Sequence, residues 1–303
     1  MSSYETKGKY AIVTGAGSGI NLAFAEQLLE KGCSVILADL KLRPEAEEVL
    51  LKYTNTEAGK PSAVFQKVDL ADWGQISSLW KVALQTFPQI DIVCNGAGIY
   101  EPPESSFWHP PGISPLAQDS EDANPGQYKT FAVNTAAPIR IAQLAIDYWL
   151  QNRNVQGNII WIASLAAYVH SLHVPIYLAS KAAIASFVRS VGVLKKHFGI
   201  RNAAICPGRV HTPLFGDKAR PDELGMTPEQ CASVMMRVLT EPQYGDGNII
   251  EAMMVGAKED PKLNVREVPM EALYPTTGTF SDQNYLLDEE AKIVRQLQEH
   301  GMK

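Results

Sequence analysis

The chain has 303 residues and a formal net charge of -6 at neutral pH, with 46% of its residues apolar and 20% charged. This composition is typical of a soluble globular protein, and the acidic balance argues against a nucleic-acid partner because no basic excess exists to neutralise phosphates. The cysteines lack CxxC spacing and no signal-peptide or membrane-span pattern occurs, so we expect a reduced cytoplasmic protein without a zinc site or a membrane partner.

Short apolar runs alternate with amphipathic segments along most of the chain. Runs such as YAIVT and DIVCN are apolar on both faces, as in a buried parallel sheet. The alternation predicts a single α/β domain over 1–303, a Rossmann-type doubly wound parallel sheet of about seven strands flanked by helices, with its core at about 8–255. We expect strands at 10–14, 34–39, 63–68, 90–94, 158–163, 201–205 and 248–254. We expect helices at 20–31, 45–54, 73–86, 128–150, 177–197 and 228–239.

The first strand runs into the glycine-rich turn TGAGSGIN, which precedes the first helix. Glycines at such a turn let the backbone approach a pyrophosphate at the helix N-terminus, where free N–H groups favour negative charge. The second strand ends in Asp39, whose carboxylate would bond ribose hydroxyls and repel a 2′-phosphate, favouring NAD over NADP. The alternative is that Asp39 caps the helix that follows it.

Two segments interrupt the alternation. Residues 100–127 contain six prolines, which exclude a regular element, and residues 258–303 form a polar extension with a short amphipathic helix at 288–300. Each is either surface decoration or a substrate lid or subunit contact. In the first segment, Phe107 and Trp108 are either lid residues or anchors that pack the segment down.

The stretch from Ser164 to Lys181 carries the residues best suited to proton transfer. Tyr177 and Lys181 are four residues apart on a predicted helix and therefore share one face. A free phenol has a pKa of about 10, and a fixed positive charge nearby favours its ionised form. Ser164 lies 13 residues before Tyr177 and adds a hydroxyl group. These residues indicate proton exchange with a substrate oxygen.

Further motifs follow in a fixed order along the chain. They are Asp69-Leu70 after the third strand, Asn95-Gly96-Ala97-Gly98 after the fourth, Asn134 in the long helix, Pro207-Gly208 after the sixth strand, and Thr212-Pro213. Together with the glycine-rich turn, Asp39 and Ser164-Tyr177-Lys181, they resemble the short-chain dehydrogenase/reductase superfamily over about residues 8–255.

The resemblance implies hydride transfer between NAD and a carbonyl or secondary alcohol. It implies that Tyr177 is the general acid/base, that Ser164 holds the substrate oxygen, that Lys181 binds the nicotinamide ribose and depresses the pKa of Tyr177, and that Asn134 positions a proton-relay water. The cofactor-binding residues it implies are Gly15, Ser18, Gly19, Ile20, Asp39, Leu40, Asp69, Leu70, Asn95, Gly96, Ala97, Tyr177, Lys181, Pro207, Gly208, Val210 and Thr212.

Two positions depart from the family pattern. Asn21 stands where the third glycine of TGxxxGxG is expected, and Gly96 stands where NNAG has its second Asn. A glycine at position 21 would permit close packing of helix on strand, so Asn21 implies a local shift or a polar contact near the phosphates. Gly96 loses a side-chain hydrogen bond but keeps the backbone that faces the cofactor.

The runs NAAICPGRVHT and GNIIEAMMVG resemble the NAD-dependent 15-hydroxyprostaglandin dehydrogenase branch and fungal secondary-metabolite dehydrogenases such as hydroxyaverantin dehydrogenase. That branch implies a bulky lipophilic alcohol as substrate. Small residues on the helices 128–150 and 177–197 match a family contact that forms a homodimer or homotetramer, although packing within one subunit would give the same pattern. The alternative function is a non-catalytic NAD-sensing or scaffold protein.

Four histidines fall near these motifs, but the sequence does not favour a metal site. His170 and His173 lie between Ser164 and Tyr177, while His109 and His211 come from separate segments. Zinc sites rarely draw on such dispersed loops, and we expect no metal. The neighbouring residues are better explained as an apolar wall of a substrate pocket, and they are Tyr168, Val169, Leu172, Val174 and Ile176. Leu214 and Phe215, after Pro213, match the position of the mobile substrate loop in the family, and the alternative is that they pack an ordinary loop onto the body of the protein.

Overall fold

The computed structural model of the protein describes residues 3–54, 57, 59–123, 126–218, 222–269 and 283–302. Pro125 of the proline-rich segment and residues 270–282 of the C-terminal extension lie outside these ranges. Among the helices of the described ranges, none combines the length and the apolar character needed to cross a bilayer.

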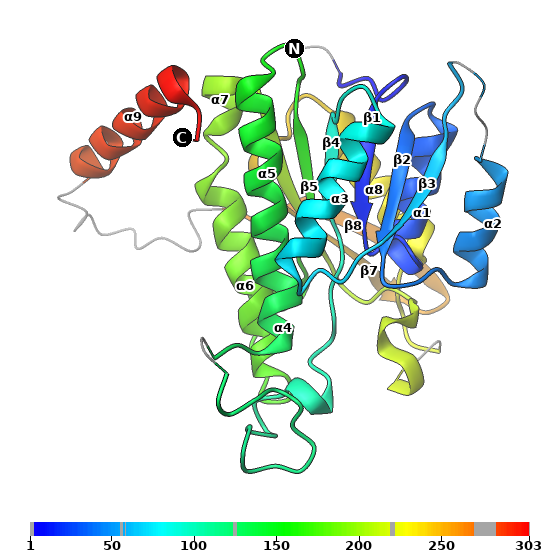
Figure 1. The fold of residues 1–303 in the computed structure, drawn as a ribbon. Helices are drawn as coiled ribbons and strands as arrows, with labels where there is room; N and C mark the ends of the chain where they lie inside the picture. The colour runs from blue at the N-terminus through cyan, green and yellow to red at the C-terminus, as the bar shows by residue number, and fades with distance from the viewer. Residues whose placement is uncertain are drawn as a thin grey trace.

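One sheet of eight strands forms the centre of the molecule, in the order β3-β2-β1-β4-β5-β6-β7-β8 (Figure 1). β8 pairs antiparallel with β7, and the other neighbouring pairs run parallel. The predicted parallel α/β fold is therefore confirmed, with eight strands against about seven expected. The strands are β1 (Tyr10–Thr14), β2 (Ser34–Asp39), β3 (Ala63–Lys67), β4 (Ile92–Asn95), β5 (Asn158–Ile162), β6 (Arg201–Pro207), β7 (Asp246–Ala257) and β8 (Asp260–Glu267).

Helices cover both faces of the sheet and close two apolar cores. Because side chains alternate along a strand, Val13 of β1 packs into the core under α1, α2 and α8, while Ile12 packs into the core under α3, α5, α6 and α7. The helices are α1 (Gly19–Glu30), α2 (Pro44–Lys52), α3 (Trp73–Thr86), α4 (Lys129–Phe131), α5 (Ala137–Gln151), α6 (Pro175–Ser190), α7 (Leu194–Phe198), α8 (Pro228–Thr240) and α9 (Gln283–His300).

The long helix expected at 128–150 runs from α4 to α5 through a π-helical turn, Ala132–Ala136, that contains Asn134. The helix expected at 177–197 begins two residues earlier, at Pro175, and is divided between α6 and α7. β8 was expected to be loop, because its sequence DPKLNVRE is mostly polar and has only Leu263 and Val265 as apolar residues. It forms nonetheless, since its backbone pairs with β7 over eight positions from Ala257–Asp260 to Ile250–Glu267.

The order of the strands places a crevice at the carboxyl edge of the sheet. β1 lies between β2 and β4, so the chain leaves β1 toward one side of the sheet and leaves β4 toward the other. Ligands of open α/β sheets bind at such a switch point. The proline-rich segment extends beyond this edge (Figure 1) and contains one short 3-10 turn, Pro103–Ser105.

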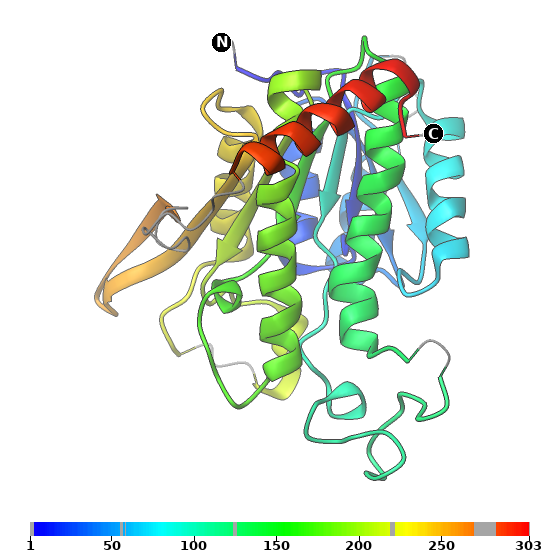
Figure 2. The ribbon, with the colours of Figure 1, turned by 90° about the vertical axis from the view of Figure 1, so that its left-hand side faces the viewer.

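The C-terminal helix α9 lies across the outer face of α5 and α6 (Figure 2). Val294 of α9 is buried, and the Arg153 guanidinium donates a hydrogen bond to the Leu297 carbonyl oxygen of the same helix. The helix α9 therefore packs against the body of the protein, on the layer that includes Lys181.

Candidate active site

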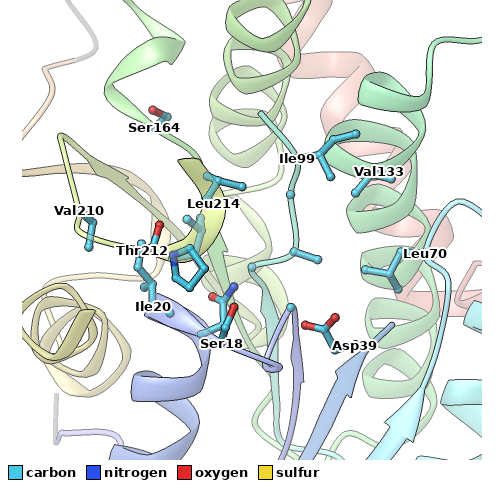
Figure 3. Close-up of a pocket in the computed structure, with 18 of the residues that line it drawn as sticks. Ser18, Ile20, Asp39, Leu70, Ile99, Val133, Ser164, Val210, Thr212 and Leu214 are labelled. Carbon is cyan, nitrogen blue, oxygen red and sulfur yellow. The ribbon is translucent and has the colours of Figure 1, made fainter. Parts of the chain in front are cut away.

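A cavity of about 380 Å³ occupies the carboxyl edge of the sheet. Figure 3 shows Asp39 and Ser18 toward one end of this cavity and Ser164 toward the other. Of the predicted site residues, Asn95 and Asn134 lie outside its lining. The cavity brings together Gly15, Ser18, Gly19, Ile20, Asp39, Leu40, Asp69, Leu70, Gly96, Ala97, Ser164, Tyr177, Lys181, Pro207, Gly208, Val210 and Thr212.

The glycine-rich turn forms one wall of the cavity. Gly15 has a φ of 72° and Gly19 a φ of 60°, which are left-handed conformations that L side chains rarely adopt. A Cβ atom on Gly15 would also lie 2.7 Å from Ala97 Cα, so a side chain there would push the turn off the segment after β4. α1 begins at Gly19, and its N-cap Ser18 makes no side-chain cap. The backbone N–H groups at this helix start therefore face a cavity suited to an anion.

Asp39 accepts a hydrogen bond from the backbone of the glycine-rich turn. One carboxylate oxygen accepts a hydrogen bond of 2.8 Å from Gly17 N, and the other accepts one of 3.4 Å from Lys41 N. α2 begins at Pro44 with Arg43 as its N-cap, so Asp39 does not cap that helix. The carboxylate instead fixes the glycine-rich turn and lines the cavity.

Tyr177, Lys181 and Ser164 converge from two elements. Ser164 follows β5, while Tyr177 and Lys181 stand in the first two turns of α6. Tyr177 is 8% exposed and Lys181 is 4% exposed. The Lys181 ammonium donates a hydrogen bond of 2.9 Å to the Ile162 carbonyl oxygen and lies 5.8 Å from the centroid of the Tyr177 ring.

Burial dominates the titration of both groups. It raises the pKa of Tyr177 to about 12, and a hydrogen bond with the Ser164 side chain opposes this rise only in part. Burial also lowers the pKa of Lys181 to about 8. The lowering of the Tyr177 pKa by Lys181 stays a prediction: burial has the largest effect on that pKa, and the Lys181 ammonium donates its hydrogen bond to the Ile162 carbonyl oxygen.

Asn134 lies next to the cavity but is not one of the residues that line it. Its amide oxygen accepts from Ile99 N at 2.8 Å, and its amide nitrogen donates to Ile99 O at 2.9 Å and to Ser180 Oγ at 3.1 Å. A Cβ on Gly98 would lie 3.3 Å from Asn134 Oδ1 and 3.4 Å from Lys181 Nζ. Asn134 therefore fixes the segment after β4, which passes between Asn134 and Lys181 at Gly98. Asn95 is likewise internal, since its amide donates to the Pro138 carbonyl oxygen.

A buried glutamate that the sequence did not single out caps the helix of Tyr177. The N-cap position of α6 is Val174, which has no side-chain acceptor, and Glu101 takes that role by accepting a hydrogen bond of 2.9 Å from Tyr177 N. Its other oxygen accepts from Ser106 Oγ at 3.0 Å and Phe107 N at 3.1 Å. Glu101 is 4% exposed and joins the proline-rich segment to the helix of Tyr177.

Aromatic contacts tie the same segment to the loop between Ser164 and Tyr177. The Tyr100 ring meets the Tyr177 ring edge to face at 4.9 Å, and it meets His173 at 6.4 Å. Trp108 is 49% exposed, yet its indole N–H donates a hydrogen bond of 2.8 Å to the Leu172 carbonyl oxygen. Trp108 is therefore an anchor between the two segments. Among the described residues, no three His, Cys, Asp or Glu side chains gather in a metal-binding group.

The substrate-facing part of the wall comes largely from residues next to the motifs. Ile99 and Val133 flank Gly98 and Asn134, and Leu214 follows Thr212-Pro213 (Figure 3). Their signal in the sequence was only their position beside a recognised residue. The lining residues that belong to none of the recognised motifs are Val68, Ile99, Lys129, Val133, Ile162 and Ala163.

Comparison with known proteins gives consistent matches. The family model described as short chain dehydrogenase matches residues 9–223. The chain is 31% identical over 265 residues to the 15-hydroxyprostaglandin dehydrogenase [NAD(+)] of Bos taurus, with 85% of this chain and 88% of that protein covered. It is 32% identical over 215 residues to the hydroxynaphthalene reductase-like protein Arp2 of Metarhizium majus, with 70% and 72% covered. A short-chain dehydrogenase/reductase structure from Mycobacterium marinum shares the fold with a TM-score of 0.66 at 20% identity, over 82% of this chain and 94% of that one.

Proposed function

The chain belongs to the short chain dehydrogenase family, and we propose that it transfers a hydride between NAD and a secondary alcohol or ketone of a lipophilic or aromatic metabolite. The observation that carries the proposal is one cavity lined by the glycine-rich turn, Asp39, and the Ser164, Tyr177 and Lys181 side chains. A dinucleotide and a hydride donor or acceptor would then meet within one binding site.

The residues present fit a dinucleotide. Gly15 leaves the space that a Cβ would fill, and the start of α1 presents N–H groups for a pyrophosphate. Asp39 offers carboxylate oxygens to ribose hydroxyls and an unfavourable charge to a 2′-phosphate, which supports NAD over NADP. The name of the Bos taurus relative supports the same cofactor. When bound, NAD accepts or returns the hydride.

Tyr177 is the residue that transfers the proton. With its pKa raised to about 12, the phenol is neutral near pH 7 and can donate a proton to a carbonyl oxygen during reduction. In the oxidative direction the phenolate must form first, and the proton of the alcohol passes to it. Ser164, which shares a hydrogen bond with Tyr177, holds the substrate oxygen beside the phenol. The Lys181 ammonium supplies a positive charge 5.8 Å from the centroid of the Tyr177 ring and would bind the cofactor ribose.

The substrate preference rests on the wall of the cavity. Ile99, Val133 and Leu214 line it, and the Tyr100 ring packs against Tyr177 at its edge. An apolar or aromatic group beside the reacting carbon would bury surface against these side chains.

We also propose a homodimer or homotetramer built on the face of α5 and α6. Because α9 lies across that face, the partner subunit would contact α9 as well (Figure 2). Sedimentation of the full chain would test this assembly, and a monomer at micromolar concentration would refute it.

The test is to follow NADH absorbance with the purified protein and a panel of secondary alcohols of increasing apolar size, with NADP as the comparison cofactor. Turnover with NAD that rises with apolar size is expected. Tyr177→Phe should abolish turnover and leave NADH binding intact, since only the phenolic oxygen is removed. NADH binding without turnover on any alcohol or ketone would refute the proposal in favour of a non-catalytic NAD-binding protein.

A further inference from the structure

Asn21 and Gly96, the two departures from the family pattern, lie against each other. A Cβ on Gly96 would come within 2.0 Å of Asn21 Oδ1, 2.4 Å of its Cγ and 2.7 Å of its Nδ2. These are the three atoms nearest to that position. Gly96 does not have a positive φ, so its backbone would accept an ordinary L residue. Position 96 therefore requires glycine because the Asn21 side chain occupies the space that a Cβ would fill.

The Asn21 amide oxygen has no hydrogen-bond partner among the described residues. Its side chain lies in the first turn of α1, is 9% exposed, and its Oδ1 is buried without a hydrogen bond. Oδ1 is an acceptor enclosed against Gly96, so it cannot bond a phosphate, and the Nδ2 donor is the part of the amide left for a ligand at the cavity wall. Asn21, Gly15 and Gly96 all line the cavity, and Nδ2 lies 2.9 Å from the position of a Cβ on Gly15.

We propose that Asn21 and Gly96 compensate for each other: the Asn21 amide fills the volume over Gly96 and donates a hydrogen bond to the pyrophosphate of the dinucleotide. The inference rests on the proposed function, because it names a residue that binds the proposed cofactor. In the family pattern, the glycine stands on the helix and the amide side chain on the segment after β4. In this chain the amide is carried by α1, next to the N–H groups that face the same anion. A carboxamide NH₂ suits a phosphate oxygen, which is an acceptor only.

The packing half of the proposal is tested without any cofactor. Thermal unfolding is measured for the wild type, Asn21→Ala, Gly96→Ala and the double variant. In the wild-type background, Gly96→Ala forces a Cβ into the amide and should lower the Tm by about 4 °C or more. In the Asn21→Ala background the same substitution should cost at most about 1 °C, because the three clashing atoms are gone. An equal loss of Tm in the two backgrounds would overturn the proposal that the two residues compensate for each other.

The binding half is tested by fluorescence titration of NADH, ADP-ribose and AMP. Asn21→Ala should raise the Kd of NADH and of ADP-ribose about tenfold, the effect of losing one hydrogen bond to a charged group, and should leave the Kd of AMP within about twofold. Asn152→Ala is the matched control, since its amide bonds the Tyr148 carbonyl oxygen at the end of α5 and should leave all three values unchanged.

The outcomes separate the two proposals. A wild-type protein that binds neither NADH nor ADP-ribose would overturn the proposed function itself. A wild-type protein that binds both, with Asn21→Ala unchanged in all three titrations, would overturn the role of Asn21 and leave the proposed function standing. Equal weakening of AMP and ADP-ribose would also overturn it, because the pyrophosphate would then not be the group that Asn21 recognises.

Discussion

Removal of the Glu101 carboxylate should disturb catalysis through the helix that carries Tyr177. The carboxylate accepts three hydrogen bonds, from Tyr177 N, Ser106 Oγ and Phe107 N, at 2.9, 3.0 and 3.1 Å. Glu101 does not itself line the cavity and bonds Tyr177 only at its backbone N–H, so it is a positioning residue. At about 1 kcal/mol of net stability for each bond, Glu101→Ala should lower the free energy of unfolding by about 3 kcal/mol. At about 2 °C per kcal/mol, the Tm should fall by about 6 °C.

The effect on turnover follows from geometry. Without the cap, the first turn of α6 is free to shift, and a displacement of the phenol by a fraction of an ångström should lower kcat by about tenfold. The Kd of NADH should stay within about twofold, because the glycine-rich turn and Asp39 lie on other elements. Glu101→Gln keeps the shape and one acceptor oxygen, so it should lose about half of the stability and recover most of kcat.

Steady-state kinetics at saturating NAD, titration of NADH and thermal unfolding measure these three quantities on one preparation. Glu104→Ala is the matched control, since Glu104 is a partly exposed glutamate of the same segment. A Glu101→Ala protein with unchanged kcat would refute the positioning role even if its Tm fell. An unchanged Tm would refute the energetic argument.

Three further predictions follow from the cavity. Tyr177 must lose its proton before it can accept one from an alcohol, and its pKa is raised. The kcat for oxidation should therefore rise as pH increases from about 6 to about 8, while the kcat for ketone reduction should not. A flat oxidative profile, measured from NADH formation, would contradict this assignment. Asp39→Asn keeps an acceptor for Gly17 N but removes the charge, so kcat/KM for NADP relative to NAD should rise about tenfold, and an unchanged ratio would refute the ribose role. Trp108→Phe removes the bond to the Leu172 carbonyl oxygen, so KM for the alcohol should rise about threefold with no change in the Kd of NADH; an unchanged KM would show that this anchor does not shape the pocket.

The parts of the fold that the sequence predicted best are those whose signal is local. β1, β2 and α3 begin and end at the predicted residues, since fully buried strands are continuous apolar runs and α3 has an Asp72 cap. β8 was missed because its charged side chains are largely exposed and only pairing with β7 makes it a strand. The π-helical turn at Asn134 was missed because hydrophobic periodicity does not distinguish it from a continuous helix.

The difference between local and long-range signals also separates the site residues that the sequence predicted from those that it missed. Residues of the cavity that sit in contiguous motifs, such as the glycine-rich turn and the segment after β4, were predicted because those motifs resemble the family pattern. Glu101 could not be, because its partner Tyr177 is 76 residues away and nothing around Glu101 forms a pattern. The contact of Asn21 with Gly96 was hidden for the same reason, although both residues were recognised as departures from the family pattern.

Long-range hydrogen bonds also connect the reacting end of the cavity to the edge of the sheet. Tyr168, which follows Ser164 in the chain, donates a hydrogen bond of 2.7 Å to Glu251 of β7, and the Arg266 guanidinium of β8 bonds both oxygens of the same carboxylate. The Arg266 hydrogen bond lowers the pKa of Glu251, and burial raises the pKa of Tyr168, so donor and acceptor keep their roles across the neutral range. Glu251 and Arg266 lie beyond residue 223, where the family match ends. The loop beside Tyr177 is therefore held on one side by the proline-rich segment, through Trp108, and on the other by the β7–β8 hairpin.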